Sequence, residues 1–254
     1  FEPLADAFRE AGIDSATYSY PDDQPIADSA AQLSKDLKAH AEKYPQRPIY
    51  LVTHSMGGLV SRAVIEQSEL DPGTVTKLIM IAPPNYGSQL ARFAFGIDLF
   101  DQLTEESVSD EVTRFYTAVE DGLSEAKDDL KPDSAFLRKL NSQARNANVR
   151  YSIFLASGGH MDQRRIDALR ETLRTGAEKS TAVGLFAPHL DETLADLDEV
   201  VAGKGDGVVA IKRGRLPDVD DVVLAEFTHL SVLQAPATFE GDAVFQGVVK
   251  RLRN

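Results

Sequence analysis

Residues 49–62 read IYLVTHSMGGLVSR, and this stretch decides the fold. It opens with a continuous apolar run, 49–52, whose β-branched members are typical of a central strand buried on both faces. A tight turn with two glycines follows, and the apolar residues after it recur at helical spacing: Leu59, Val60, Ala63 and Val64. The local order is therefore strand, turn, helix, with Ser55 in the turn.

Ser55 meets the requirements of a serine nucleophile. A hydroxyl is a weak nucleophile at neutral pH, so an enzyme must expose it, place a base within reach and supply donors for the oxyanion. A strand-to-helix elbow lifts the serine above the sheet and aims the next backbone N–H, that of Met56, at the developing charge. The positions two residues away must be small, and they hold Thr53 and Gly57. The alternative is that Ser55 only caps the helix.

The stretch THSMGGLVSR resembles the elbow of α/β-hydrolase lipases, especially the lipase and lecithin:cholesterol-acyltransferase-like branch. Four further segments resemble that branch: APPNYGS at 82–88, KPDSAFLRKLN at 131–141, GDGVV at 205–209 and THLSVL at 228–233. The resemblance covers most of the chain. It implies an α/β-hydrolase fold in which the serine, the acid and the histidine of a triad follow one another along the chain.

Asp206 and His229 are the acid and the base that this order selects. Asp206 lies in the turn 203–207, where flanking glycines let a carboxylate loop approach another loop closely. His229 follows a predicted strand and is the only histidine after Asp206. An ordinary Asp-Gly turn and a packed structural histidine are the alternatives, with Asp220 and Asp221 as the next acids to consider.

The remaining histidines are expected to have no catalytic role. His54 adjoins Ser55, but neighbouring side chains on an elbow diverge, so we expect it to pack or to line the site. His40 lies on a predicted solvated helix face, whereas His160 and His189 belong to an inserted segment where substrate contact is the lesser alternative. The His, Asp and Glu residues show no metal-ligand spacing, and we predict neither a metal nor a cofactor.

The chain, 1–254, is predicted to form a single α/β-hydrolase domain whose mainly parallel sheet is flanked by helices. The predicted strands are 13–20, 49–52, 78–82, 149–156 and 222–227, with a short extended piece at 208–211. The predicted helices are 1–11, 26–44, the segment after Ser55, and a last one that includes 247–252. Helical patterns without strand signals predict cap insertions at about 90–148 and 158–203.

The chain starts at Phe1 with apolar residues already at helical spacing, so we expect the first strands of the sheet to precede it. By resemblance, a second oxyanion donor comes from an HG-type loop after an early strand. No such loop occurs in these 254 residues. We therefore expect it upstream of Phe1 or, failing that, an incomplete oxyanion hole whose loss of one donor slows the reaction by about a hundredfold or more.

Composition excludes several classes of protein. A formal net charge of −13 argues against binding to nucleic acid, because that function needs a clustered basic face. These 254 residues contain no apolar run long enough to span a membrane. Without cysteine it forms no disulfide and uses no cysteine nucleophile, which leaves the compartment open. The oligomeric state is equally open.

The sequence thus predicts a serine hydrolase that cleaves a carboxylic ester, a lipase or esterase, through an acyl-enzyme on Ser55. The substrate is a small-molecule or lipid ester, and an apolar stretch in the first insertion favours a lid over an acyl chain: Leu90, Phe93, Phe95, Ile97, Leu99, Phe100 and Leu103. Two alternatives stay open, namely an acyltransferase that uses the same triad and a binding protein that kept the fold without catalysis.

Overall fold

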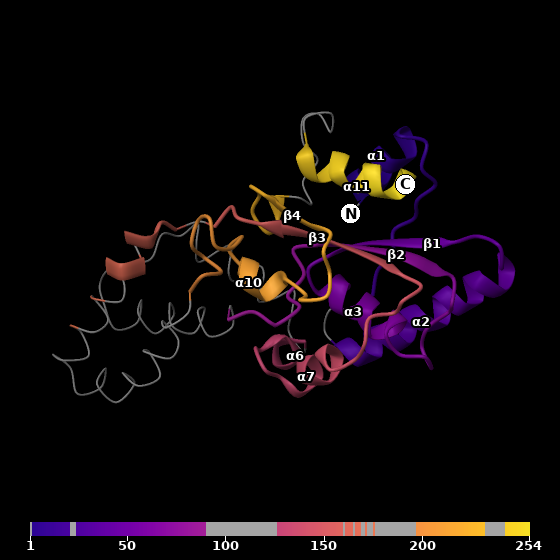
Figure 1. The fold of residues 1–254 in the computed structure, drawn as a ribbon, viewed down its shortest axis with the longest axis horizontal. Coiled ribbons are helices and arrows are strands. Elements are labelled where there is room, and N and C mark those ends of the chain that lie inside the picture. Colours follow the sequence, from indigo (N-terminus) through magenta and orange to yellow (C-terminus); the bar gives the residue numbers. More distant parts are fainter. Residues whose placement is uncertain are drawn as a thin grey trace.

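The structure, a computed structural model, describes residues 2–20, 24–89, 126–159, 161–164, 166–168, 171, 175, 197–231 and 242–254. Its centre is a sheet of four strands whose spatial order, β1-β2-β3-β4, is also their order along the chain (Figure 1). The strands are β1 Ile49–His54, β2 Val75–Ile81, β3 Arg150–Ala156 and β4 Val222–Ala225. Each neighbouring pair is parallel.

Helices cover both faces of this sheet (Figure 1). They are α1 Glu2–Glu10, α2 Ile26–Lys43, α3 Met56–Ile65, α6 Lys127–Leu130, α7 Ala135–Asn141, α10 Ile211–Gly214 and α11 Ala243–Arg253. Alternate residues of β2 enter two separate cores: Leu78 and Met80 pack with α2 and α3, whereas Ile79 and Ile81 pack with α1 and α11. The sheet is therefore the middle layer of three.

Parallel pairing decides where chemistry can occur. The carboxyl ends of all four strands lie at the same edge of the sheet, so the loops that leave them are neighbours. Ser55 follows β1 directly, Pro83 follows β2 after one residue, and His229 follows β4 after three. Residues far apart in the sequence are thereby brought to one edge.

The strands predicted at 49–52, 78–82, 149–156 and 222–227 and the helices predicted at 1–11, 26–44 and 247–252 are all confirmed, with small shifts at their ends. The strand predicted at 13–20 is wrong, because these described residues pair with no described strand and most of them are exposed. Strand propensity without a ladder partner does not make a strand. The extended piece predicted at 208–211 ends one residue earlier than predicted: Ala210 is extended and bridges Gly205, and α10 starts at Ile211.

β1 differs from its predicted position as well. It pairs with β2 on one side, lies at the end of the described sheet and is mostly half-buried rather than buried on both faces. Of the first predicted cap insertion, 126–148 is described and contains α6 and α7, while 90–125 and most of the second insertion lie outside the described residues. Within the described part of the chain, no helix has the length and apolar character that crossing a membrane requires.

Candidate active site

The turn between β1 and α3 holds Ser55 in a backbone conformation that few residues adopt. Its φ is 51° and its ψ is −128°, a region that is strained for any residue with a Cβ. The Ser55 N–H donates to the carbonyl of Ile81 at the end of β2 (2.9 Å), and the Ser55 carbonyl accepts from the N–H of Gly58 (3.0 Å). The strain is therefore supported on both sides, as in a nucleophile elbow.

Crowding at the elbow accounts for its small residues. A Cβ added at Gly57 would lie 3.6 Å from the Cβ of Thr53, an ordinary contact, so threonine fits where glycine is more usual. A Cβ at Gly58 would lie 3.1 Å from the Cβ of Pro83, which is tight. The helix can start directly under the loop after β2 only because residue 58 has no side chain.

Ser55, His229 and Asp206 form one chain of hydrogen bonds. His229 Nε2 lies 2.9 Å from Ser55 Oγ, and His229 Nδ1 lies 2.8 Å from Asp206 Oδ2. An ionised carboxylate only accepts, so the Nδ1 proton points to Asp206 and the neutral ring leaves Nε2 as the acceptor for the serine hydroxyl. That is the tautomer a general base needs. The histidine and the aspartate are 3% and 1% exposed, so water competes little for these bonds.

The loop around Asp206 fixes its carboxylate. Oδ1 accepts from the N–H groups of Val208 (2.8 Å) and Val209 (2.7 Å), which leaves Oδ2 for the histidine. The Asp206 carbonyl also accepts the backbone N–H of His229 (2.9 Å). Gly207 makes this turn possible, because its φ of 101° suits glycine alone.

The structure thus brings together the three side chains that the sequence selected. Ser55 occupies the N-cap position of α3, but its side chain makes no capping hydrogen bond to the described helix, so the capping alternative is not what its hydroxyl does. Asp221 is wrong as a substitute acid, because it bonds to Ser152 and Arg251 at the amino end of β4. Asp220 lies at that same end.

Met56 is the first residue of α3 and is 5% exposed. The N–H groups of a first helical turn have no partner inside the helix, and the positive end of the helix dipole lies there. This N–H therefore stands beside Ser55 where an oxyanion donor is required. Among the described residues, no group of three His, Cys, Asp or Glu side chains is arranged to hold a metal ion.

The other histidines divide into two groups. His54 is half-buried against His229, with ring centres 4.6 Å apart, and its Nε2 lies 2.8 Å from the His229 carbonyl. Desolvation, and then the neighbouring His229, lower the pKa of His54 well below its ordinary value. His40 is exposed on α2, and both His160 and His189 lie outside the described residues. The sequence indicated only that His54 packs near the site and gave no sign of its bond.

The loop after β2, 82–89, joins the elbow to the loop that carries Asp206. Ser88 Oγ donates to the carbonyl of Val208 (2.5 Å), and Asn85 Nδ2 donates to the carbonyl of Gly214 (2.7 Å). Asn85 Oδ1 in turn accepts from Arg62 Nη1 of α3 (2.9 Å). Ser55 and Asp206 are therefore held to one another through this loop as well as through His229.

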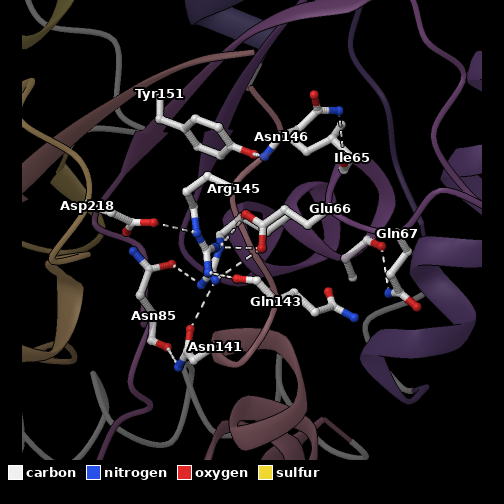
Figure 2. A network of polar contacts seen from close by, with 12 residues as sticks. Ile65, Glu66, Gln67, Asn85, Asn141, Gln143, Arg145, Asn146, Tyr151 and Asp218 are labelled. Atoms are coloured by element: carbon white, nitrogen blue, oxygen red, sulfur yellow. Dashed lines mark hydrogen bonds and ion pairs between the residues drawn. The ribbon is translucent and has the colours of Figure 1, made fainter. Parts of the chain in front are cut away.

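Arg62 belongs to a buried polar network on the α3 side of the sheet. Figure 2 shows Glu66, Asn85, Asn141 and Arg145 converging from the end of α3, the loop after β2, α7 and the segment before β3; Glu66 is the residue that follows α3. Arg62 is fully buried, and its guanidinium bonds to Glu66 (3.0 Å), Asn85 (2.9 Å) and Asn141 (3.0 Å). Arg145 adds a second cation 2.5 Å from Glu66 Oε2. Burial raises the pKa of Glu66 despite both arginines.

Comparisons with known proteins support this fold. The family model described as "Domain of unknown function (DUF7379)" matches residues 18–174. Over 82 residues the chain is 33% identical to Triacylglycerol lipase 2 of Saccharomyces cerevisiae (strain ATCC 204508 / S288c), a match that spans 32% of this chain and only 24% of that protein.

Solved structures match over much more of the chain. The mature form of Bacillus licheniformis lipase BlEst2 superposes with a TM-score of 0.60 and 18% identity over 96% of this chain and 82% of that one. Staphylococcus hyicus lipase gives a TM-score of 0.52 and 15% identity over 92% and 82%. The metagenomic carboxyl esterase MGS0156 gives 0.50 and 18% over 96% and 63%. The fold is thus an α/β-hydrolase fold, as the sequence predicted.

Proposed function

The chain belongs to the family described as "Domain of unknown function (DUF7379)", and we propose that it is a carboxylic ester hydrolase that works through an acyl-enzyme on Ser55. One observation carries the proposal: the unbroken chain of hydrogen bonds from Ser55 Oγ through both nitrogens of His229 to Asp206 Oδ2. This arrangement activates a hydroxyl by removing its proton during attack.

In the first half of the reaction, Ser55 Oγ bonds to the ester carbonyl carbon while His229 Nε2 takes the hydroxyl proton. The carbonyl π electrons move to oxygen, and the Met56 N–H is the donor that faces the resulting oxyanion. As the carbonyl re-forms, the C–O bond to the leaving alcohol breaks and its oxygen takes the proton from His229. Asp206 stabilises the imidazolium in between and remains ionised.

In the second half, water replaces the serine hydroxyl. His229 Nε2 takes a proton from water as its oxygen bonds to the acyl carbon, and the tetrahedral intermediate then expels Ser55 Oγ. The serine recovers its proton from His229, and the carboxylic acid leaves. In both halves, His229 Nε2 transfers the proton while Nδ1 stays bonded to Asp206, so the reaction requires no rearrangement of the histidine between the halves.

The similar proteins favour an ester as the substrate. Those from B. licheniformis and S. hyicus are named lipases, the metagenomic one is named a carboxyl esterase, and the S. cerevisiae protein is named a triacylglycerol lipase. The acid loop lies between β3 and β4, so Ser55, Asp206 and His229 follow one another in the order serine, acid, histidine that is typical of this fold. We therefore place ester hydrolysis ahead of the other reactions of this fold.

A fluorophosphonate probe tests the proposal directly, because it reacts only with an activated serine. We expect the intact protein to be labelled on Ser55, as located by mass spectrometry, and to hydrolyse a short-chain p-nitrophenyl ester. Ser55→Ala should lose both properties, whereas Ser68→Ala, an exposed serine after α3, should keep both. A folded protein that is neither labelled nor active, or a Ser55→Ala variant with full esterase activity, contradicts the proposal.

A further inference from the structure

His54 makes a hydrogen bond that identifies its own protonation state. The carbonyl oxygen of His229 can only accept, so His54 Nε2, 2.8 Å away, must carry a proton and donate. Desolvation keeps the pKa of His54 well below its ordinary value, so the ring stays neutral and its single proton is on Nε2. A neutral donor can lie beside His229 without opposing the imidazolium that forms there.

With this bond, His229 makes three hydrogen bonds in the described structure in addition to the one with Ser55. Its backbone N–H donates to the Asp206 carbonyl (2.9 Å), its Nδ1 donates to Asp206 Oδ2 (2.8 Å), and its carbonyl accepts from His54. Two of the three come from the acid loop. The third comes from the last residue of β1, the neighbour of Ser55 in the chain.

This third bond closes a short ring. From Ser55 Oγ the ring runs through the imidazole of His229 to its carbonyl, across to the His54 side chain, and back along one peptide bond to Ser55. The separation between Oγ and Nε2 is thereby set by the last residue of β1 and the turn residue that follows it, as well as by the loop that carries His229. Among the described residues, this hydrogen bond joins that loop to β1 itself.

We propose that His54 is a positioning residue, which fixes the main chain of His229 so that Nε2 meets Ser55 Oγ. The inference rests on the proposed function, because it concerns the alignment of the same nucleophile and base. Misalignment of reacting groups by as little as about 1 Å lowers rates by about a hundredfold. The bond therefore serves the chemical step and not the binding of substrate.

Two substitutions separate the donor from the bulk of the ring. His54→Leu removes the donor, whereas His54→Gln places an amide N–H near the position of Nε2. We expect His54→Leu to lower kcat by about tenfold or more, with KM changed by less than about twofold, and to slow fluorophosphonate labelling in parallel. His54→Gln should recover kcat to within about threefold of the wild type. The matched control His40→Leu, at an exposed histidine, should equal the wild type.

A His54→Leu variant with wild-type kcat overturns the inference, and so does a His54→Gln variant as impaired as His54→Leu. Should the leucine variant not fold, nitrogen-15 NMR of the wild-type ring decides the matter. We expect a proton on Nε2 of a neutral His54 at pH 7, and a proton on Nδ1 alone overturns the proposal. The NMR result does not depend on activity. An unlabelled wild type with the expected tautomer therefore contradicts the proposed function, while an active enzyme indifferent to His54→Leu contradicts only this inference.

Discussion

At the scale of single residues, each group around His229 is held in place by a small number of identified contacts. Ser55 is held in a strained backbone conformation that exposes its hydroxyl. One carboxylate oxygen of Asp206 accepts from two backbone N–H groups, and the other accepts from the ring of His229. The division matters, because it fixes the direction in which Oδ2 points and so orients the imidazole ring of His229. Orientation of the acid is thus built into its own turn.

Asp206→Asn tests that division. An amide nitrogen at the position of Oδ2 would donate to Nδ1 and so move the ring proton to Nε2, where it blocks removal of the serine proton. We expect kcat to fall by about 10³–10⁴ with KM changed little. Steady-state kinetics on a p-nitrophenyl ester measures this, with Asp220→Asn, an exposed acid at the other end of β4, as the control. An Asp206→Asn enzyme that keeps more than about a tenth of its kcat would show that another group orients the histidine.

At the scale of elements, the buried network of Figure 2 joins α3 to the loop after β2 and to α7. Arg62 lies on the last turn of α3 and Glu66 is the residue directly after the helix, four positions later; both side chains are fully buried. A buried charge is tolerated only when it is paired. Asn85 also bonds to Gly214, the last residue of α10, which follows the acid loop. The network therefore helps to position the acid loop as well as stabilising the fold.

Arg62→Met should therefore be costly, because it leaves Glu66 buried with Arg145 as its remaining cation. We expect a loss of about 3 kcal/mol in the free energy of unfolding at pH 7, the low end of the range for a broken buried pair. Urea denaturation measures it, and Arg138→Met on the exposed face of α7 is the control. A loss below about 1 kcal/mol would mean that the network contributes little.

The same variant has a defined pH dependence. Burial raises the pKa of Glu66 in the folded state, and removal of Arg62 raises it further, so the folded variant binds a proton that the unfolded chain releases. Stability lost at neutral pH should return as pH falls through that raised pKa towards the ordinary carboxyl value. The difference in unfolding free energy between wild type and Arg62→Met should then shrink at acidic pH. In a Glu66→Gln background this dependence should vanish.

Sequence patterns predicted the elements that carry the site better than the contacts between them. The apolar runs before Ser55 and before His229 have a strand-like sequence, and both pair with a neighbouring strand. Residues 13–20 also have a strand-like sequence but pair with no described strand. The order serine, acid, histidine selected three residues that the structure brings together. The bond from His54 joins positions 175 residues apart, and no periodicity in a sequence encodes such a contact. The sequence did not predict the bonds of Arg62 to Asn85 and Asn141 for the same reason, since these residues are also far from Arg62 along the chain.

At the scale of the whole molecule, the parallel sheet explains why residues far apart in the sequence meet at one site. Helices bury its two faces, and the described loops that leave the carboxyl ends of the strands carry Ser55, Asp206 and His229. All three residues lie within one or a few residues of an ordered element or a hydrogen-bonded turn. In the proposed reaction the substrate binds at Ser55, so a charged substrate meets the electrostatic field of the chain.

That field is strongly negative at neutral pH, with a formal net charge of −13. A neutral ester feels it weakly, but an ester that carries a carboxylate is repelled, and salt screens the repulsion. We expect kcat/KM for an anionic p-nitrophenyl ester, such as the monosuccinate, to rise by about threefold or more between about 10 and 200 mM NaCl, while the value for p-nitrophenyl acetate stays nearly constant. Equal responses of the two esters would argue that salt acts on the protein itself, and a fall for the anionic ester would reveal a local positive field at the mouth of the site that outweighs the net charge.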